Sequence, residues 1–283
     1  MTEPALHYRL SGPAGAPVVV LTGSLGTDLS MWEPQARALA QRFRVVCWDI
    51  RGHGRSAVRP GPYTIAELGG DLLALLDRLD IARASLCGLS IGAMLSLWAA
   101  AHAPERVDRL IACCTTAHFG DEAAGAYRER AARVRREGLE PLADTVIARW
   151  FTPAFARRCP HAVVRLRNGL IATPSEGYAS CCEALAEMDL RPDLARLSAP
   201  TLVLAGECDT ATPAEHGRAI ADTVAGAQVL EVPCAAHLAS IERAELVTAL
   251  MLRFLAEPGC PHPATEQSAC AHQGAPFPHR GAP

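Results

Sequence analysis

Short, mostly apolar runs occur along the first 116 residues of the chain, and turn-forming residues or amphipathic stretches follow each run. Runs of this kind are typical of strands that are buried on both faces of a parallel sheet. They occupy residues 18–22, 43–48, 84–87 and 107–113. The segment 6–10 alternates more and predicts a strand at an edge of the sheet.

Helical patterns lie between these predicted strands, at residues 32–41, 64–79 and 91–101. In the second of them six apolar side chains fall on one helical face, as expected of a helix that covers a core. They are Ile65, Leu68, Leu72, Leu75, Leu76 and Leu79. The alternation of strand and helix predicts an α/β fold, with a mostly parallel sheet and helices on both of its faces.

The alternation stops after residue 116, and residues 121–197 show helical patterns only. Prolines at 153, 160 and 174 separate the predicted helices 122–137, 139–150, 162–171 and 176–188. Strand patterns return at 201–205 and 228–232, with helical patterns at 213–224 and 239–255. We therefore predict a core made of residues 1–116 and 199–256, and an inserted helical cap of residues 117–198 over the carboxyl edge of the sheet.

The composition of the chain limits the classes of molecule that we expect it to bind. The chain has 27 basic and 30 acidic residues and no basic block, which argues against binding to nucleic acid. No early apolar run is long enough to span a membrane, and the first residues do not resemble a signal peptide. Several of the 11 cysteines stand in apolar runs, as reduced buried thiols do. We expect a cytoplasmic protein that acts on a small molecule.

Residues 257–283 differ from the rest, because they are rich in Pro and Gly and have no hydrophobic periodicity. We predict a disordered tail. It contains Cys260, His262, Cys270 and His272, but their spacing matches no familiar closed zinc site, so no metal is expected.

The central chemical feature is Gly88-Leu89-Ser90-Ile91-Gly92, which stands between a predicted strand and a predicted helix. This is the setting of a nucleophile elbow, a turn so tight that side chains at its two glycines would collide with neighbouring elements. The turn exposes the serine hydroxyl and aims the first N–H groups of the helix at the same point. The pattern alone is weak, and a plain strand-to-helix turn with a solvated serine is the alternative.

A serine hydroxyl is a poor nucleophile unless a base takes its proton and an acid orients that base. Asp209 follows the predicted strand 201–205, and His237 follows the strand 228–232. Both stand at strand carboxyl ends, on the edge that carries Ser90, so we predict Ser90, Asp209 and His237 as a catalytic triad. Glu207 is the rival acid, and Asp209 could instead cap the next helix.

Three further polar residues are expected to have structural or surface roles, namely His53, His102 and Asp49, the last holding the turn at residues 49–56 together. A negative oxygen that develops during attack needs donors. We predict the backbone N–H groups of Ile91 and Leu25 as this oxyanion hole.

These residues resemble the α/β-hydrolase superfamily, and more narrowly the 3-oxoadipate enol-lactonase family. The resemblance runs from about residue 7 to residue 254. Its family-specific parts are the loop 24–28 with Met31-Trp32, and the cap stretches 149–153, 177–182 and 188–191. It implies an α/β-hydrolase fold with a helical cap, and a serine hydrolase that opens 3-oxoadipate enol-lactone with water in the β-ketoadipate pathway of aromatic-compound catabolism. No cofactor is implied.

Such a lactone carries a free carboxylate, for which a cationic or polar anchor is expected. Candidates in the cap are Arg149, Arg165 and Arg167, with Trp150 as an apolar wall and Ser24 on the core side; a solvated helix face is the alternative for each arginine. A general carboxylesterase, a perhydrolase or a C–C bond hydrolase of the same fold remains the alternative activity. A ligand-sensing protein without turnover is disfavoured by the complete triad.

Overall fold

The computed structural model describes residues 5–256, so residues 1–4 and the predicted tail with its Cys and His residues lie outside the described residues. A seven-stranded sheet forms the centre, in the order β1-β3-β2-β4-β5-β6-β7. Only β1 pairs antiparallel with its neighbour, β3; the other pairs are parallel. The strands are β1 Tyr8–Ser11, β2 Val18–Thr22, β3 Arg44–Trp48, β4 Ala84–Leu89, β5 Val107–Cys113, β6 Thr201–Gly206 and β7 Gln228–Val232.

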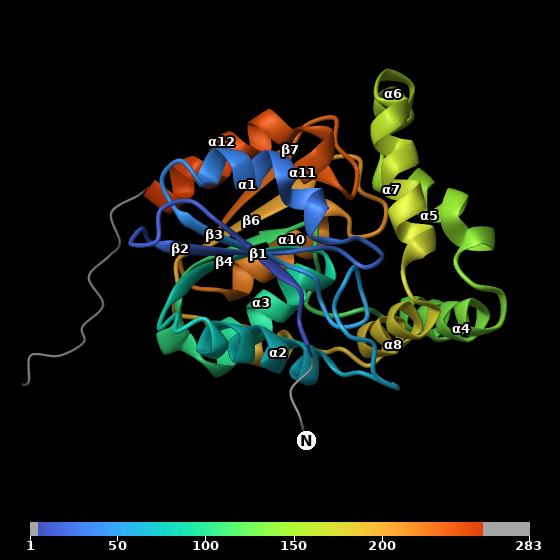
Figure 1. Cartoon of the computed structure of the whole chain (residues 1–283), viewed down its shortest axis with the longest axis horizontal. Coiled ribbons are helices and arrows are strands. Elements are labelled where there is room, and N and C mark those ends of the chain that lie inside the picture. The colour runs from blue at the N-terminus through green and yellow to red at the C-terminus, as the bar shows by residue number, and fades with distance from the viewer. Residues whose placement is uncertain (1–4, 257–283) are drawn as a thin grey trace, which may run out of the picture.

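Helices cover both faces of this sheet (Figure 1), which confirms the predicted α/β arrangement. On one face α1 packs against α12, and on the other α2 packs against α3, which also contacts β4 and β5. The core elements other than strands are η1 Leu29–Trp32, α1 Glu33–Leu39, α2 Ile65–Arg78, α3 Ile91–His102, η2 Pro104–Arg106, α10 Ala214–Thr223, α11 Ala239–Glu242 and α12 Ala244–Ala256.

Helix α2 shows how the sequence fixes an element. Thr64 accepts a hydrogen bond from the Glu67 N–H, and Glu67 accepts one from the Thr64 N–H, so a capping box starts the helix. Five of its six predicted apolar positions are buried against the core, and Leu79 at its end is partly buried. None of the helices within residues 5–256 is both long and apolar enough to cross a membrane.

Between β5 and β6 the described chain has helices but no strand, and they project beyond one edge of the sheet (Figure 1). We call α4 to α8 the cap helices. They are α4 Asp121–Glu137, η3 Glu140–Leu142, α5 Ala143–Trp150, α6 Pro153–Arg158, α7 Pro160–Ala172 and α8 Ser175–Ala186, and α9 Arg191–Leu194 then leads back to the core against α3.

Two of the differences from the sequence prediction have a clear physical cause. Helix α6 was not predicted, because it has only six residues between two prolines and shows no full helical period. The predicted helix 239–255 is two helices, α11 and α12, because Arg243 leaves the helical conformation between them (φ −125°, ψ 47°). This break turns the end of α11 toward the cap.

Candidate active site

The turn from β4 to α3 places Ser90 at the carboxyl edge of the sheet. Its backbone has φ 57° and ψ −121°, a strained conformation for a residue with a side chain. A Cβ atom at Gly88 would lie 2.2 Å from the carbonyl of Gly92, and one at Gly92 would lie 2.4 Å from the carbonyl oxygen of Thr22. Both positions therefore require glycine, as expected of an elbow. The Ser90 N–H donates to the Cys113 carbonyl at 2.9 Å, which ties the elbow to β5.

Asp209 and His237 contact each other in the loops that follow β6 and β7, at the same edge of the sheet. His237 Nδ1 lies 2.8 Å from Asp209 Oδ2, and both side chains are almost fully buried. Burial alone would raise the pKa of Asp209, but the facing imidazole and the hydrogen bonds from Thr212 hold that pKa below its ordinary value. The carboxylate therefore stays ionised beside the ring, and the contact at Nδ1 leaves Nε2 as the free ring nitrogen.

Thr212 is a site residue that the sequence did not indicate. Its hydroxyl donates to Asp209 Oδ2 at 2.9 Å and lies 3.4 Å from His237 Nδ1, and its N–H lies 3.1 Å from Asp209 Oδ1. The Ala211 N–H donates to the same oxygen. These bonds orient the carboxylate, and the only signal for them was a hydroxyl residue three positions after the acid.

The loop after β7 carries His237 back across the sheet. β6 separates β7 from β5, so this loop must pass over the end of β6 to approach Ser90. A Cβ atom at Gly206 would lie 2.5 Å from the Ala236 carbonyl oxygen, which shows how closely it does so. Further along, the Ser240 carbonyl accepts a hydrogen bond from Gln35 in α1, beyond β2. The loop thus crosses the edge that holds Ser90.

No hydrogen bond joins Ser90 Oγ to His237 among residues 5–256. The structure brings Asp209 and His237 into contact and places Ser90 at the same edge of the sheet. Hydrogen bonds between catalytic groups are often long in unliganded enzymes and shorten with substrate bound. The His237 loop or the Ser90 side chain would therefore have to move to complete the line of three groups.

The other acidic and histidine residues that the sequence brought into question, Glu207, Asp49 and His53, have hydrogen-bond partners outside the triad. The Glu207 carboxylate is exposed and accepts from the Cys234 N–H at 2.7 Å, not from His237. Asp49 accepts hydrogen bonds from the N–H groups of Leu29 and Arg55, and its Oδ2 lies 2.7 Å from His7 Nδ1, so it does hold its turn together. His53 is fully buried, and burial lowers its pKa to about 4.

The two predicted oxyanion donors stand at the start of α3 and in the turn after β2. Ile91 is the first residue of α3, and Leu25 is buried in the turn after β2. Neither N–H donates to another backbone or side-chain group within the described part of the chain. The next residue, Gly26, has φ +77°, and a Cβ atom there would lie 2.5 Å from Leu170 and 3.1 Å from Tyr178 in the cap. Ser24 is buried, and its carbonyl accepts from Thr27.

The three cap arginines lie in different surroundings. Arg149 lines a cavity of about 520 Å³ with Thr210 and Ala211, the two residues that follow Asp209. Arg167 is paired with the carboxylates of Asp144 and Glu140, at 2.7 and 3.2 Å. Arg165 is exposed, and its guanidinium lies 3.4 Å from the Ser30 hydroxyl.

Two more aspects of the cap bear on the site. Trp150 is buried, and its carbonyl accepts the N–H of Leu238, the residue after His237. Arg130, which the sequence did not single out, lines the same cavity as Arg149 and lies over the Tyr127 ring. Among residues 5–256 no group of three or more His, Cys, Asp or Glu side chains is placed to hold a metal ion.

Comparisons with known proteins agree with this architecture. The family model for the alpha/beta hydrolase fold matches residues 16–244. 3-oxoadipate enol-lactonase 2 of Acinetobacter baylyi is 43% identical over 254 residues, which cover 88% of this chain and 94% of that protein. 3-oxoadipate enol-lactonase 1 of the same organism is 37% identical over 85% of this chain and 89% of its own length.

A solved structure gives the same result in three dimensions. The enol-lactonase from Burkholderia xenovorans LB400 superposes with a TM-score of 0.87 at 44% identity, over 89% of this chain and 96% of that one. The chain therefore belongs to the α/β-hydrolase fold family and, within it, to the group of the 3-oxoadipate enol-lactonases.

Proposed function

We propose that this protein is a serine hydrolase that opens 3-oxoadipate enol-lactone to 3-oxoadipate, with Ser90 as nucleophile, His237 as general base and Asp209 as the acid that orients it. One observation carries the chemistry: the buried Asp209–His237 contact of 2.8 Å lies at the edge of the sheet on which the elbow holds Ser90. The similarity to two enol-lactonases over most of the chain carries the choice of substrate.

The reaction follows from these positions. His237 Nε2 takes the Ser90 proton while Oγ attacks the ring carbonyl of the lactone, and Asp209 stabilises the imidazolium through Nδ1. The N–H groups of Leu25 and Ile91 donate to the carbonyl oxygen as it becomes negative. The ring oxygen leaves as an enolate, which His237 protonates and which becomes a ketone.

Water then releases the product. His237 takes one proton of a water molecule, the hydroxide attacks the Ser90 ester, and Ser90 leaves with that proton. The sum is lactone plus water giving 3-oxoadipate, with no further reagent. We assign the anchoring of the substrate carboxylate to Arg149 rather than Arg167, since Arg149 lines the cavity next to Asp209 and Arg167 already has two carboxylate partners.

The test is ultraviolet monitoring of 3-oxoadipate enol-lactone hydrolysis beside a p-nitrophenyl ester, for wild type and Ser90→Ala. We expect a high preference for the lactone, and a kcat that falls by roughly 10⁴–10⁶-fold in the variant. Ser85→Ala removes a hydroxyl from the other end of β4 and is the matched control, with unchanged kcat. Equal efficiency on both substrates would favour a general carboxylesterase, and full activity of Ser90→Ala would refute the assignment.

A further inference from the structure

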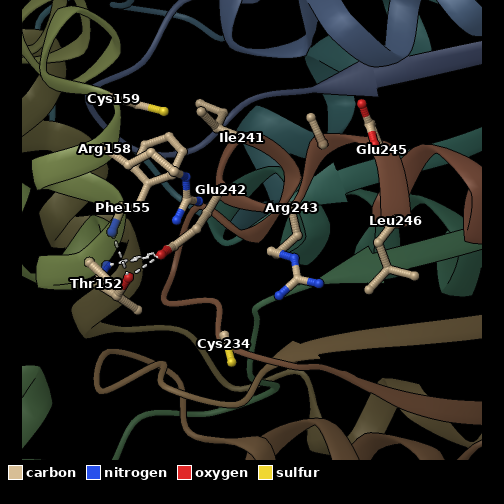
Figure 2. Close-up of a pocket in the computed structure, with 12 residues that line it drawn as sticks. Thr152, Phe155, Arg158, Cys159, Cys234, Ile241, Glu242, Arg243, Glu245 and Leu246 are labelled. Carbon is tan, nitrogen blue, oxygen red and sulfur yellow. Dashed lines mark hydrogen bonds between the residues drawn. The ribbon is translucent and has the colours of Figure 1, made fainter.

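A second buried carboxylate lies close to His237 and is not part of the triad. Glu242 ends α11, and only 5% of its surface is exposed. Its Oε2 accepts the N–H of Ala236 at 3.0 Å. The Thr152 N–H lies 3.3 Å from each of its oxygens, and the Thr152 hydroxyl donates to Oε1. Figure 2 shows the bonds from Thr152 of the cap converging on the Glu242 carboxylate of the core.

A second hydrogen bond joins the His237 loop to the cap, on the C-terminal side of His237. The N–H of Leu238 donates to the Trp150 carbonyl at 3.0 Å. Ala236 and Leu238 are the two chain neighbours of His237. The backbone on both sides of His237 is therefore held by residues 150–152, the junction between α5 and α6 of the cap. One of these links is direct, and the other runs through Glu242.

Glu242 has no cationic partner within residues 5–256. The guanidinium of Arg243, the next residue, donates to the Pro233 carbonyl, and that of Arg158 lies 5.6 Å from the centre of the Phe155 ring. The Glu242 carboxylate is thus held by neutral donors alone. A buried charge is costly unless hydrogen bonds compensate it, and a carboxylate can accept from two segments at once where an amide offers a single oxygen. This favours a carboxylate at a point where two segments must be joined.

We propose that Glu242 is a positioning residue that couples the place of His237 to the α5–α6 junction of the cap. The inference rests on the proposed function, because it concerns the base of that triad. His237 is not hydrogen-bonded to Ser90 in this structure, so the His237 loop, the Ser90 side chain or both must move before the proton can transfer. Glu242 and the Trp150 carbonyl limit the movement of the loop to positions that the cap permits. When bound substrate fixes the position of the α5–α6 junction, it therefore also fixes the position of His237.

The experiment compares Glu242→Ala, Glu242→Gln and Glu245→Ala. Glu245 lies three residues on and, like Glu242, lines the pocket drawn in Figure 2. It is exposed and its side chain makes no hydrogen bond among the described residues, so its variant is the matched control for lost charge. Each variant is assayed below its melting temperature for kcat and KM on the lactone. The rate at which a fluorophosphonate modifies Ser90 is measured as well, because it reports the activated nucleophile without the lactone.

We expect Glu242→Ala to lower kcat and the phosphonylation rate by about 10²-fold, the effect of a misplacement of about 1 Å, with KM little changed. Glu242→Gln keeps one acceptor for the Ala236 N–H and should recover part of the loss, while Glu245→Ala should match wild type. A Glu242→Ala enzyme that phosphonylates as fast as Glu245→Ala would overturn the proposal.

Three further outcomes are informative. If Glu242→Ala does not fold, Thr152→Val removes the hydroxyl bond to Glu242 from the cap side, leaving the backbone bonds, while Thr152→Ser keeps that hydroxyl bond; equal rates for these two would overturn the proposal. If wild type is phosphonylated on Ser90 but leaves the lactone intact, the proposed substrate is wrong while the role of Glu242 is still tested. If wild type is not phosphonylated, both the triad and this inference fail.

Discussion

The carboxyl edge of the sheet and the cap above it are built by different means. At the edge, buried backbone contacts fix the geometry: glycines at 88 and 92 leave no room for a side chain, and Ser90 is held in a strained conformation. In the cap, side chains make the contacts: α4 packs against α8 with buried residues on both helices, and Arg135 of α4 pairs with Glu176 and Glu183 of α8. Ion pairs near the surface contribute little stability each. We propose that the catalytic chemistry belongs to the closely packed edge of the sheet and that the choice of substrate belongs to the cap.

The two regions meet through close backbone contacts. A Cβ atom at Gly177 in α8 would lie 2.2 Å from the carbonyl oxygen of Gly52, which belongs to the turn that Asp49 holds. Gly26, beside the Leu25 N–H, likewise lies under Leu170 and Tyr178 of the cap. Because of these contacts and the hydrogen bonds of Glu242, the position of the cap on the core affects the geometry of the active site.

The largest effect that separates the two regions is expected from Asp209→Asn. An amide at this position favours the wrong tautomer of His237, and in a comparable triad that change lowers kcat by about 10⁴-fold. Because the residue belongs to the core chemistry, the loss should be similar for the lactone and for a p-nitrophenyl ester, as measured by steady-state kinetics. Glu207→Gln is the control and should retain activity. A loss of activity on the lactone alone would contradict the assignment of catalysis to the core and of substrate choice to the cap.

The next effect concerns stability in acid. Burial lowers the pKa of His53 from 6.5 to about 4. Between these two pH values the His53 side chain is protonated in the unfolded chain but neutral in the folded chain. The stability of the fold is therefore lost as pH falls from about 6.5 toward 4. This lowers the free energy of unfolding by up to about 3 kcal/mol. Urea titrations should give a flatter pH dependence for His53→Gln than for wild type. Equal slopes for wild type and His53→Gln would show that His53 is not the cause.

The smallest effect lies in the cap. Arg149→Gln removes a charged donor from the cavity beside Asp209, and such hydrogen bonds contribute about 1.5–3 kcal/mol. We expect kcat/KM for the lactone to fall by roughly 10 to 10²-fold, with no loss on an uncharged p-nitrophenyl ester. Arg167→Gln is the matched control, since that side chain is already paired with Asp144 and Glu140. If Arg167→Gln instead gives the larger loss, the anchor is misassigned.

Most of the core could be predicted from the sequence, because its signals are local. The strands at 18–22, 107–113 and 228–232 have the predicted bounds, because mostly apolar or β-branched residues bounded by turn residues mark each of them. Ser90, Asp209 and His237 could be placed at one edge because parallel strands end on the same side.

The remaining features depend on contacts between distant segments. Glu242 lies in a predicted helix, 239–255, that also contains Glu245, and an acid in such a pattern predicts a solvated position; its partner Thr152 is 90 residues away. The different surroundings of Arg149 and Arg167 could not be predicted either, because they depend on how α4, α5 and α7 pack. Helix α6 is too short to show a period.

The account depends on Ser90, Asp209 and His237 acting as one unit, and the activity of the double variant Ser90→Ala/Asp209→Asn tests this most directly. Residues that act as a unit are strongly non-additive. We predict that Asp209→Asn, which alone lowers kcat by about 10⁴-fold, removes no further activity once Ser90 is alanine. Losses that simply multiply in the double variant would contradict the account.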